Sequence, residues 1–195
     1  MGCNRPVNFI GYRSDALGAA VELVNEVSAG GAEEPEADDE SPDRMRTVLV
    51  ANGYLAGGAP ASVEPALRAW ARRLRTVFDV SDVEEAAVAV NALLADVRVE
   101  PHLSNHDGQG FHLHYSPPEA DVVDRLRAST AFALAMLVSE YGVDRHGRCA
   151  AEGCMKVFAD TSRNAARRYC SPACANRSAV AAHRARARAA ATRSR

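Results

Sequence analysis

Four of the five cysteines in this chain lie close together near its C-terminal end, and their spacing constrains the fold more than any other feature. Residues 149–174 read CAAEGCMKVFADTSRNAARRYCSPAC, which places two close pairs on either side of a fifteen-residue segment. Four thiolates can surround zinc at the corners of a tetrahedron, and such a closed set is typical of a structural site. We therefore predict one Zn²⁺ site, with a redox switch, two disulfides or unrelated structural cysteines as the alternatives. Its ligands are Cys149, Cys154, Cys170 and Cys174.

The residues beside these cysteines indicate how the segment folds. Gly153 permits the tight turn that exposes a neighbouring sulfur to metal. Residues 155–158 fit a short strand, and Ser171 with Pro172 is typical of a helix start, which places Cys174 in the first helical turn. A knuckle, a hairpin and a helix in this order predict a treble-clef-like finger. A segment of this size buries too little apolar surface to fold alone, so metal is the expected stabiliser.

Charge is divided unequally along the chain, although the overall net charge is only −2. Residues 1–144 carry 11 cationic and 23 acidic side chains, whereas residues 145–195 carry 12 and 2. A basic segment attached to an acidic body points to a polyanionic partner, first of all nucleic acid. A solvated arginine-rich helix that docks on the acidic body is the alternative. The candidate nucleic-acid-binding cations are Arg163, Arg167, Arg168, Arg177, Arg184 and Arg188, of which the last three share one side of the expected helix.

The first 144 residues show helical periodicity in several segments. We expect helices over 15–28, 44–55 and 62–78, with Ser62 as an N-cap. A fourth helix begins at a capping box formed by Ser81 and Glu84. Residues 97–103 and 111–115 are typical of a small β-hairpin, and a long helix runs from Pro118 to Gly142. The expected class is mainly α (α+β): a helical domain over 1–144 with an acidic flexible loop at 29–43, a finger over 145–191 and a basic tail over 192–195.

The C-terminal residues resemble a known family, the CGNR zinc finger. The resemblance rests on the cysteines, on Phe158, Asp160 and Ser162, on the RRYCS run at 167–171 and on CANR at 174–177. The resemblance implies a DNA-binding treble-clef-like finger in which the four cysteines hold zinc and Asn176 and Arg177 are motif residues. Ala175 replaces the family's glycine, and Tyr169 stands where the family usually has tryptophan.

The N-terminal part resembles the ABATE domain that usually precedes this finger, through the ALGAAVELVNEV segment at 16–27 and the order of its helices and hairpin. Members of that family resemble bacterial one-component regulators of stress-induced transcription. We expect residues 1–144 to sense a small-molecule ligand or a protein partner, or to form a homodimer. Together the two resemblances predict a DNA-binding transcription regulator.

Other chemistry is weakly supported by the sequence. His112 and His114 alternate along one expected strand and with His102 and His106 could form a second metal site, but no carboxylate set completes it, and a packed hairpin face is expected. A closed tetrathiolate site leaves no position for a reactive water, so we expect no enzyme. The longest apolar stretch, 131–138, is too short for a membrane span, and a cytoplasmic location is expected. A protein-binding module and an RNA-binding protein are the alternative functions.

Overall fold

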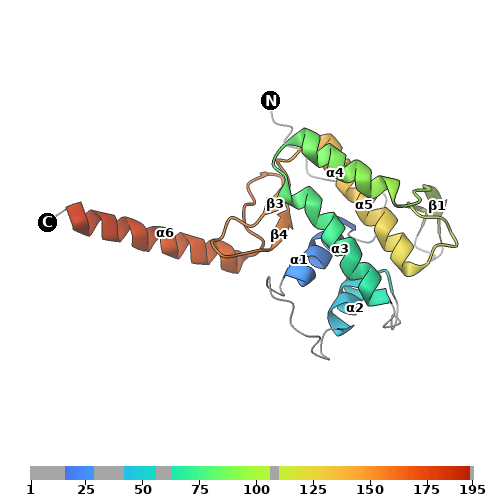
Figure 1. Ribbon diagram of the computed structural model, residues 1–195, viewed down its shortest axis with the longest axis horizontal. Coiled ribbons are helices and arrows are strands. Elements are labelled where there is room, and N and C mark those ends of the chain that lie inside the picture. Colours follow the sequence, from blue (N-terminus) through green and yellow to red (C-terminus); the bar gives the residue numbers. More distant parts are fainter. Residues whose placement is uncertain (1–15, 29–41, 56–62, 106–109, 194–195) are drawn as a thin grey trace.

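The computed structural model describes residues 16–28, 42–55, 63–105 and 110–193. Within these ranges the chain forms six helices and two antiparallel hairpins, which confirms the mainly α class (Figure 1). The helices are α1 (Ala16–Ser28), α2 (Pro42–Ala51), α3 (Glu64–Asp79), α4 (Val83–Ala95), α5 (Val122–Tyr141) and α6 (Pro172–Arg193). The strands are β1 (His102–Ser104), β2 (His112–His114), β3 (His146–Arg148) and β4 (Val157–Ala159). No helix in these ranges is long and apolar enough to cross a membrane.

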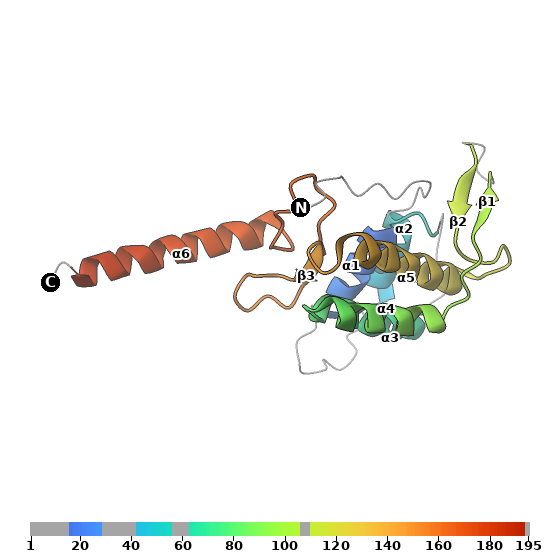
Figure 2. The ribbon, with the colours of Figure 1, turned by 90° about the horizontal axis from the view of Figure 1, so that it is seen from above.

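The first five helices pack into one bundle with a shared apolar core (Figures 1 and 2). Helix α1 contacts α2, α3 and α5, and α4 covers the other side of α3 and α5. The apolar stripe of α3 shows why the sequence folds this way, because Leu67, Trp70, Leu74 and Val77 recur at helical spacing and are all buried. Full burial of each such leucine contributes about 1.5–3 kcal/mol.

The caps of α4 and α5 differ from the sequence prediction, and α2 runs over 42–51 instead of 44–55. Asp82, rather than Ser81, is the N-cap of α4, where its carboxylate accepts hydrogen bonds from the amides of Glu84 and Glu85 at 2.9 and 3.1 Å. A carboxylate at this position also interacts favourably with the helix dipole. Asp121 likewise caps α5, so Pro118 precedes that helix instead of lying in its first turn. Gly142 ends α5 as predicted.

The β1–β2 hairpin is shorter than the sequence suggested. Residues 97–101 are not part of a strand: the amide of Val97 bonds back to the carbonyl of Leu94 in the last turn of α4, and beyond the ladder, among the described residues, only the amide of Glu100 bonds across, to the carbonyl of Tyr115 at 2.9 Å. Three residue pairs form the ladder: His102 with His114, Leu103 with Leu113, and Ser104 with His112.

The N-cap residue of α3 is Val63, which makes no side-chain cap bond, so the prediction of Ser62 as that cap was wrong. The last two residues of the predicted acidic loop, 42 and 43, lie in α2. Outside the described residues lie Ser62, the rest of that loop (29–41), the predicted hairpin turn at 106–109 and residues 194–195 of the predicted tail.

The second hairpin, β3–β4, packs against the helical bundle. It contacts α1 and α3, and Val157 and Ala159 belong to the same apolar core as the helices. Polar contacts reinforce this docking: the Asn25 side chain pairs with the backbone of Val157, and Arg75 donates to the carbonyl of Met155 at 3.0 Å. The finger hairpin is therefore fixed to the bundle, and the strand predicted over 155–158 is observed at 157–159.

Helix α6 extends away from the bundle in both views (Figures 1 and 2). Every residue from 179 to 190 is exposed to solvent. The helix continues through Arg193, so the first two residues of the predicted tail are helical. The fold thus presents the basic end of the chain as a free-standing rod.

Candidate metal centre

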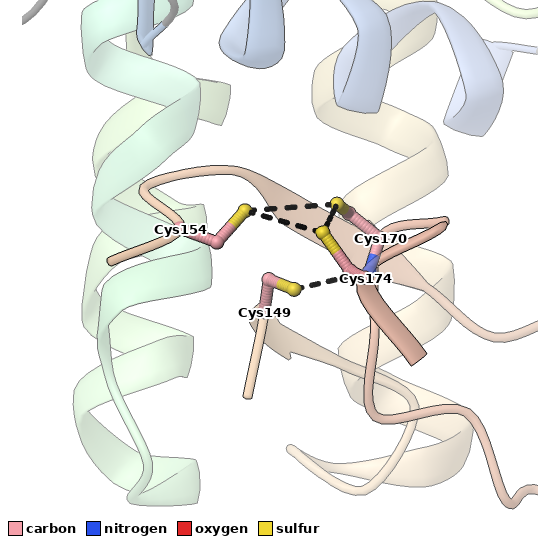
Figure 3. A group of neighbouring side chains, drawn as sticks. All are labelled: Cys149, Cys154, Cys170 and Cys174. Carbon is pink, nitrogen blue, oxygen red and sulfur yellow. Dashed lines mark hydrogen bonds between the residues drawn. The ribbon is translucent and has the colours of Figure 1, made fainter. Parts of the chain in front are cut away.

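Four cysteine side chains converge beside the start of α6 (Figure 3). Their sulfur atoms all lie within 4.8 Å of one another. The sulfurs of Cys154, Cys170 and Cys174 are 3.6–3.8 Å apart. A tetrahedral ion with metal–sulfur bonds of about 2.3 Å requires sulfur–sulfur separations of about 3.8 Å. The cluster therefore has the spacing and the donor chemistry of a structural zinc site.

Local backbone structure places the first pair of cysteines. Cys149 follows β3, where its amide continues the ladder by bonding to the carbonyl of Lys156 at 2.8 Å. The amide of Cys154 bonds to the carbonyl of Ala151 at 3.0 Å, which closes a tight turn. Gly153 in that turn has a φ of +70°, a left-handed conformation that favours glycine. The predicted knuckle is confirmed.

The start of α6 places the second pair. The Ser171 hydroxyl accepts a hydrogen bond from the amide of Cys174 at 3.3 Å, the pattern of an N-cap residue. Cys174 consequently lies in the first helical turn, and Cys170 immediately precedes the Ser171 cap. Tyr169 packs against the cysteine cluster, as expected for the residue that replaces tryptophan. The helix is thus attached directly to the metal centre.

The electrostatics of the cluster explain why it needs a cation. Burial and the neighbouring thiols raise the pKa of Cys170 to about 12, and burial raises the pKa of Cys154. The hydrogen bond with the Ser171 hydroxyl, opposed by burial and assisted by the other thiols, lowers the pKa of Cys174 to about 7. Close thiols cannot all ionise unless a divalent ion compensates their charge. Arg177 adds a cation outside the cluster, since its guanidinium donates to the Cys174 sulfur at 3.4 Å.

The loop between the two cysteine pairs is organised by one buried carboxylate. Asp160 accepts hydrogen bonds from the amides of Ser162 and Arg167 at 2.9 and 2.8 Å. Burial alone would raise the pKa of Asp160, but these bonds and the nearby Arg145 guanidinium outweigh it and hold that pKa below its usual value. Arg145 also donates to the carbonyls of Asp160 and Ser162.

The Arg167 side chain forms hydrogen bonds within the finger. Its guanidinium donates to the carbonyls of Ala159, Tyr169 and Cys170 at 3.2, 3.1 and 2.9 Å. These contacts tie the loop to β4 and to the second cysteine pair. The sequence grouped Arg167 with the nucleic-acid-binding arginines, whereas the structure directs its donors into the finger.

The other predicted nucleic-acid-binding residues are exposed. Arg163 and Arg168 lie on the loop before α6, Asn176 and Arg177 lie in its first two turns, and Arg184 and Arg188 lie farther along it. At 100° per residue, Arg177, Arg184 and Arg188 share one side of the helix. Asn176 lies about one quarter-turn away from that side.

Sequence reasoning missed two residues that join the finger to the bundle. Asn25 bonds to both backbone groups of Val157, and the His146 imidazole donates to the carbonyl of Val77 at 3.1 Å. Asn25 lies in the 16–27 segment that resembles the ABATE domain, but no feature of that segment indicated a contact with Val157. Nothing in the sequence singled out His146.

The fold and the metal centre define a helical protein that carries a C-terminal four-cysteine zinc finger. Family models agree: the CGNR zinc finger model matches residues 145–195, and the ABATE model, described as "Putative stress-induced transcription regulator", matches residues 17–141. The chain therefore belongs to the ABATE family, and its finger is of the CGNR type, so the metal is zinc. Neither description names an enzyme. No curated protein matches the chain.

Proposed function

We propose that the protein is a transcription regulator that binds DNA through α6 and the loop before it, while the helical bundle senses a ligand or a protein partner. The observation that carries the proposal is the exposed arginine side of a helix held by the zinc site. The description of the ABATE family supports a role in transcription. The proposed division places the sensing domain at 1–144 and the finger at 145–191.

The charge of the finger suits a polyphosphate. Residues 145–195 carry a formal charge of +10, and four thiolates with one Zn²⁺ add −2. The remaining charge of about +8 attracts DNA at long range. In our proposal Arg163, Arg168, Arg184 and Arg188 contact phosphates.

The shape of α6 suits the major groove. Its 22 residues span about 33 Å. Many of its side chains are alanines, which keeps the rod thin, and the major groove is about 12 Å wide. Zinc fixes the first turn of this rod, so Asn176 and Arg177 would be held in a defined position near the DNA. Arg167 acts in this scheme by shaping the loop instead of contacting phosphate.

Fluorescence anisotropy with the zinc-loaded full chain and a labelled DNA duplex tests the proposal. If about five phosphates are engaged, the logarithm of the association constant falls against log salt with a slope of about −4.5. The double variant R184A/R188A removes two of these contacts and should reduce the slope by about 1.8. The matched control R46A/R72A removes two exposed arginines from the bundle and should leave the slope unchanged.

Three outcomes contradict the proposal. Negligible affinity for DNA at low salt rejects nucleic-acid binding. Equal slopes for R184A/R188A and the wild type reject α6 as the contact surface. Markedly tighter binding to an RNA hairpin than to the duplex reassigns the same surface to RNA.

A further inference from the structure

The β1–β2 hairpin lies at the end of the bundle opposite α6 (Figures 1 and 2). Its ladder places three histidines on one face. The ladder pairs His102 with His114 and Ser104 with His112. Residues directly opposite each other in an antiparallel ladder share a face, and so do residues two apart on one strand. His102, His112 and His114 therefore form one group, distant from the cysteine site.

The imidazoles of His112 and His114 converge on one point. Their Nε2 atoms are 3.0 Å apart, and their ring centroids are 4.8 Å apart. The ring of His102 stacks on that of His114, with centroids 5.4 Å apart and planes inclined by 19°. His112 is buried and the other two are half-buried. Two nitrogens at this distance cannot both carry protons, so the pair must share one proton or a cation.

Backbone carbonyls fix the orientation of two of the rings. His112 Nδ1 lies 3.1 Å from the carbonyl of Gly110, and His102 Nδ1 lies 3.2 Å from that of Glu100. A carbonyl only accepts, so each Nδ1 carries the hydrogen, and the lone pair of the neutral ring is then on Nε2. Metal-binding histidines are commonly oriented in this way, with the second nitrogen bonded to a carbonyl.

We infer that the Nε2 atoms of His112 and His114 form a second metal site, which takes a divalent transition ion that prefers imidazole. With metal–nitrogen bonds of about 2.0–2.1 Å, a separation of 3.0 Å corresponds to an angle at the metal of about 91–97°. That angle belongs to square or octahedral coordination and points to Ni²⁺ or Cu²⁺ instead of tetrahedral zinc. The described residues supply two ligands, which leaves further positions on the metal for other donors, unlike the closed cysteine site.

Titration of the zinc-loaded full chain with Ni²⁺ tests this site. Native mass spectrometry should show one nickel ion in addition to zinc. In ¹H–¹⁵N correlation spectra, paramagnetic Ni²⁺ should broaden the amide signals of residues 102–104 and 112–114. The variant H114Q retains a side-chain amide that can donate to His112 but lacks the imidazole ligand. Its nickel affinity should fall by about tenfold or more.

Two controls keep the test specific. The variant H183Q replaces an exposed histidine of α6 and should bind nickel as the wild type does. An unchanged melting temperature of H114Q shows that the fold survives the substitution. The inference is overturned if nickel binds but leaves the hairpin signals sharp, or if H114Q and the wild type bind nickel with equal affinity. In either case the contact between the two rings is a direct hydrogen bond.

Discussion

The contact between Asn25 and β4 gives the sharpest prediction about how the finger is held. In the β3–β4 ladder the amide of Cys149 bonds to the carbonyl of Lys156, so the amide and carbonyl of the next residue, Val157, point away from β3. The Asn25 side chain meets both groups: its oxygen accepts from the Val157 amide at 2.7 Å, and its nitrogen donates to the carbonyl at 3.1 Å. Asn25 therefore completes the open edge of this hairpin.

The substitution Asn25→Ala would leave both backbone groups of Val157 without this partner. Val157 is 0% exposed, so water cannot replace the asparagine without rearrangement. Each unsatisfied buried group costs about 1–3 kcal/mol, so the pair costs about 2–6 kcal/mol. For a chain of this length that loss lowers the melting temperature by about 5–20 °C.

Thermal unfolding of the zinc-loaded protein measures the global effect, and hydrogen exchange of the Val157 amide measures the local one. We expect the amide to exchange much faster in Asn25→Ala than in the wild type. Asn25→Asp retains the acceptor and loses the donor, so its melting temperature should fall between the two. Glu26→Ala, one residue along the same helix, is the matched control. Wild-type stability and wild-type protection of Val157 in Asn25→Ala would refute the reasoning.

Three further predictions concern the finger and its attachment. Cys154→Ser should abolish stoichiometric zinc binding in native mass spectra, whereas Cys3→Ser should retain one ion; zinc retention by Cys154→Ser would contradict the assignment. Burial lowers the pKa of His146 below its ordinary value of 6.5, opposed by the Val77 carbonyl, so the unfolded chain binds the proton more readily. The stabilising contribution of neutral His146 is therefore complete above about pH 6.5 and is lost as pH falls. From about pH 7.5 to about pH 5.5 the melting temperature should drop more in the wild type than in His146→Gln. Parallel plots of melting temperature against pH for the two proteins would contradict this prediction. In Gly153→Ala the added methyl group meets no atom within 4 Å, but alanine is strained at a φ of +70°, at a cost of about 1–2 kcal/mol. The zinc affinity of this variant should therefore fall about 5–30-fold in a chelator competition. Unchanged zinc affinity would show that alanine is not strained in this turn.

The zinc site could be predicted from sequence because its determinants are local. All four cysteines lie within 26 residues, and the glycine turn and the Ser171 cap are short-range signals. The cap of α4 could not be predicted in this way, because Ser81 and Asp82 are adjacent residues that can both cap a helix. Their choice depends on the approach of the chain to the helix, which periodicity does not encode.

The attachment of the finger to the bundle could not be predicted from sequence. Asn25 and Val157 are 132 residues apart, and no local pattern links them. Arg167 shows a different difficulty: its charge indicates a phosphate contact, whereas its hydrogen bonds to three backbone carbonyls depend on how the loop folds and could not be predicted from the sequence. The alternation of His112 and His114 predicted a shared face, whereas the convergence of their nitrogens depends on side-chain geometry.

The central claim is that zinc holds the arginine-bearing helix in the form that binds DNA. The most direct measurement compares duplex binding by the full chain in three forms at one fixed low salt concentration: zinc-loaded, chelator-treated and zinc-restored. The account predicts tight binding by the loaded protein, a large loss on chelation and recovery on restoring zinc. Equal affinity of the chelator-treated and zinc-loaded forms would contradict it.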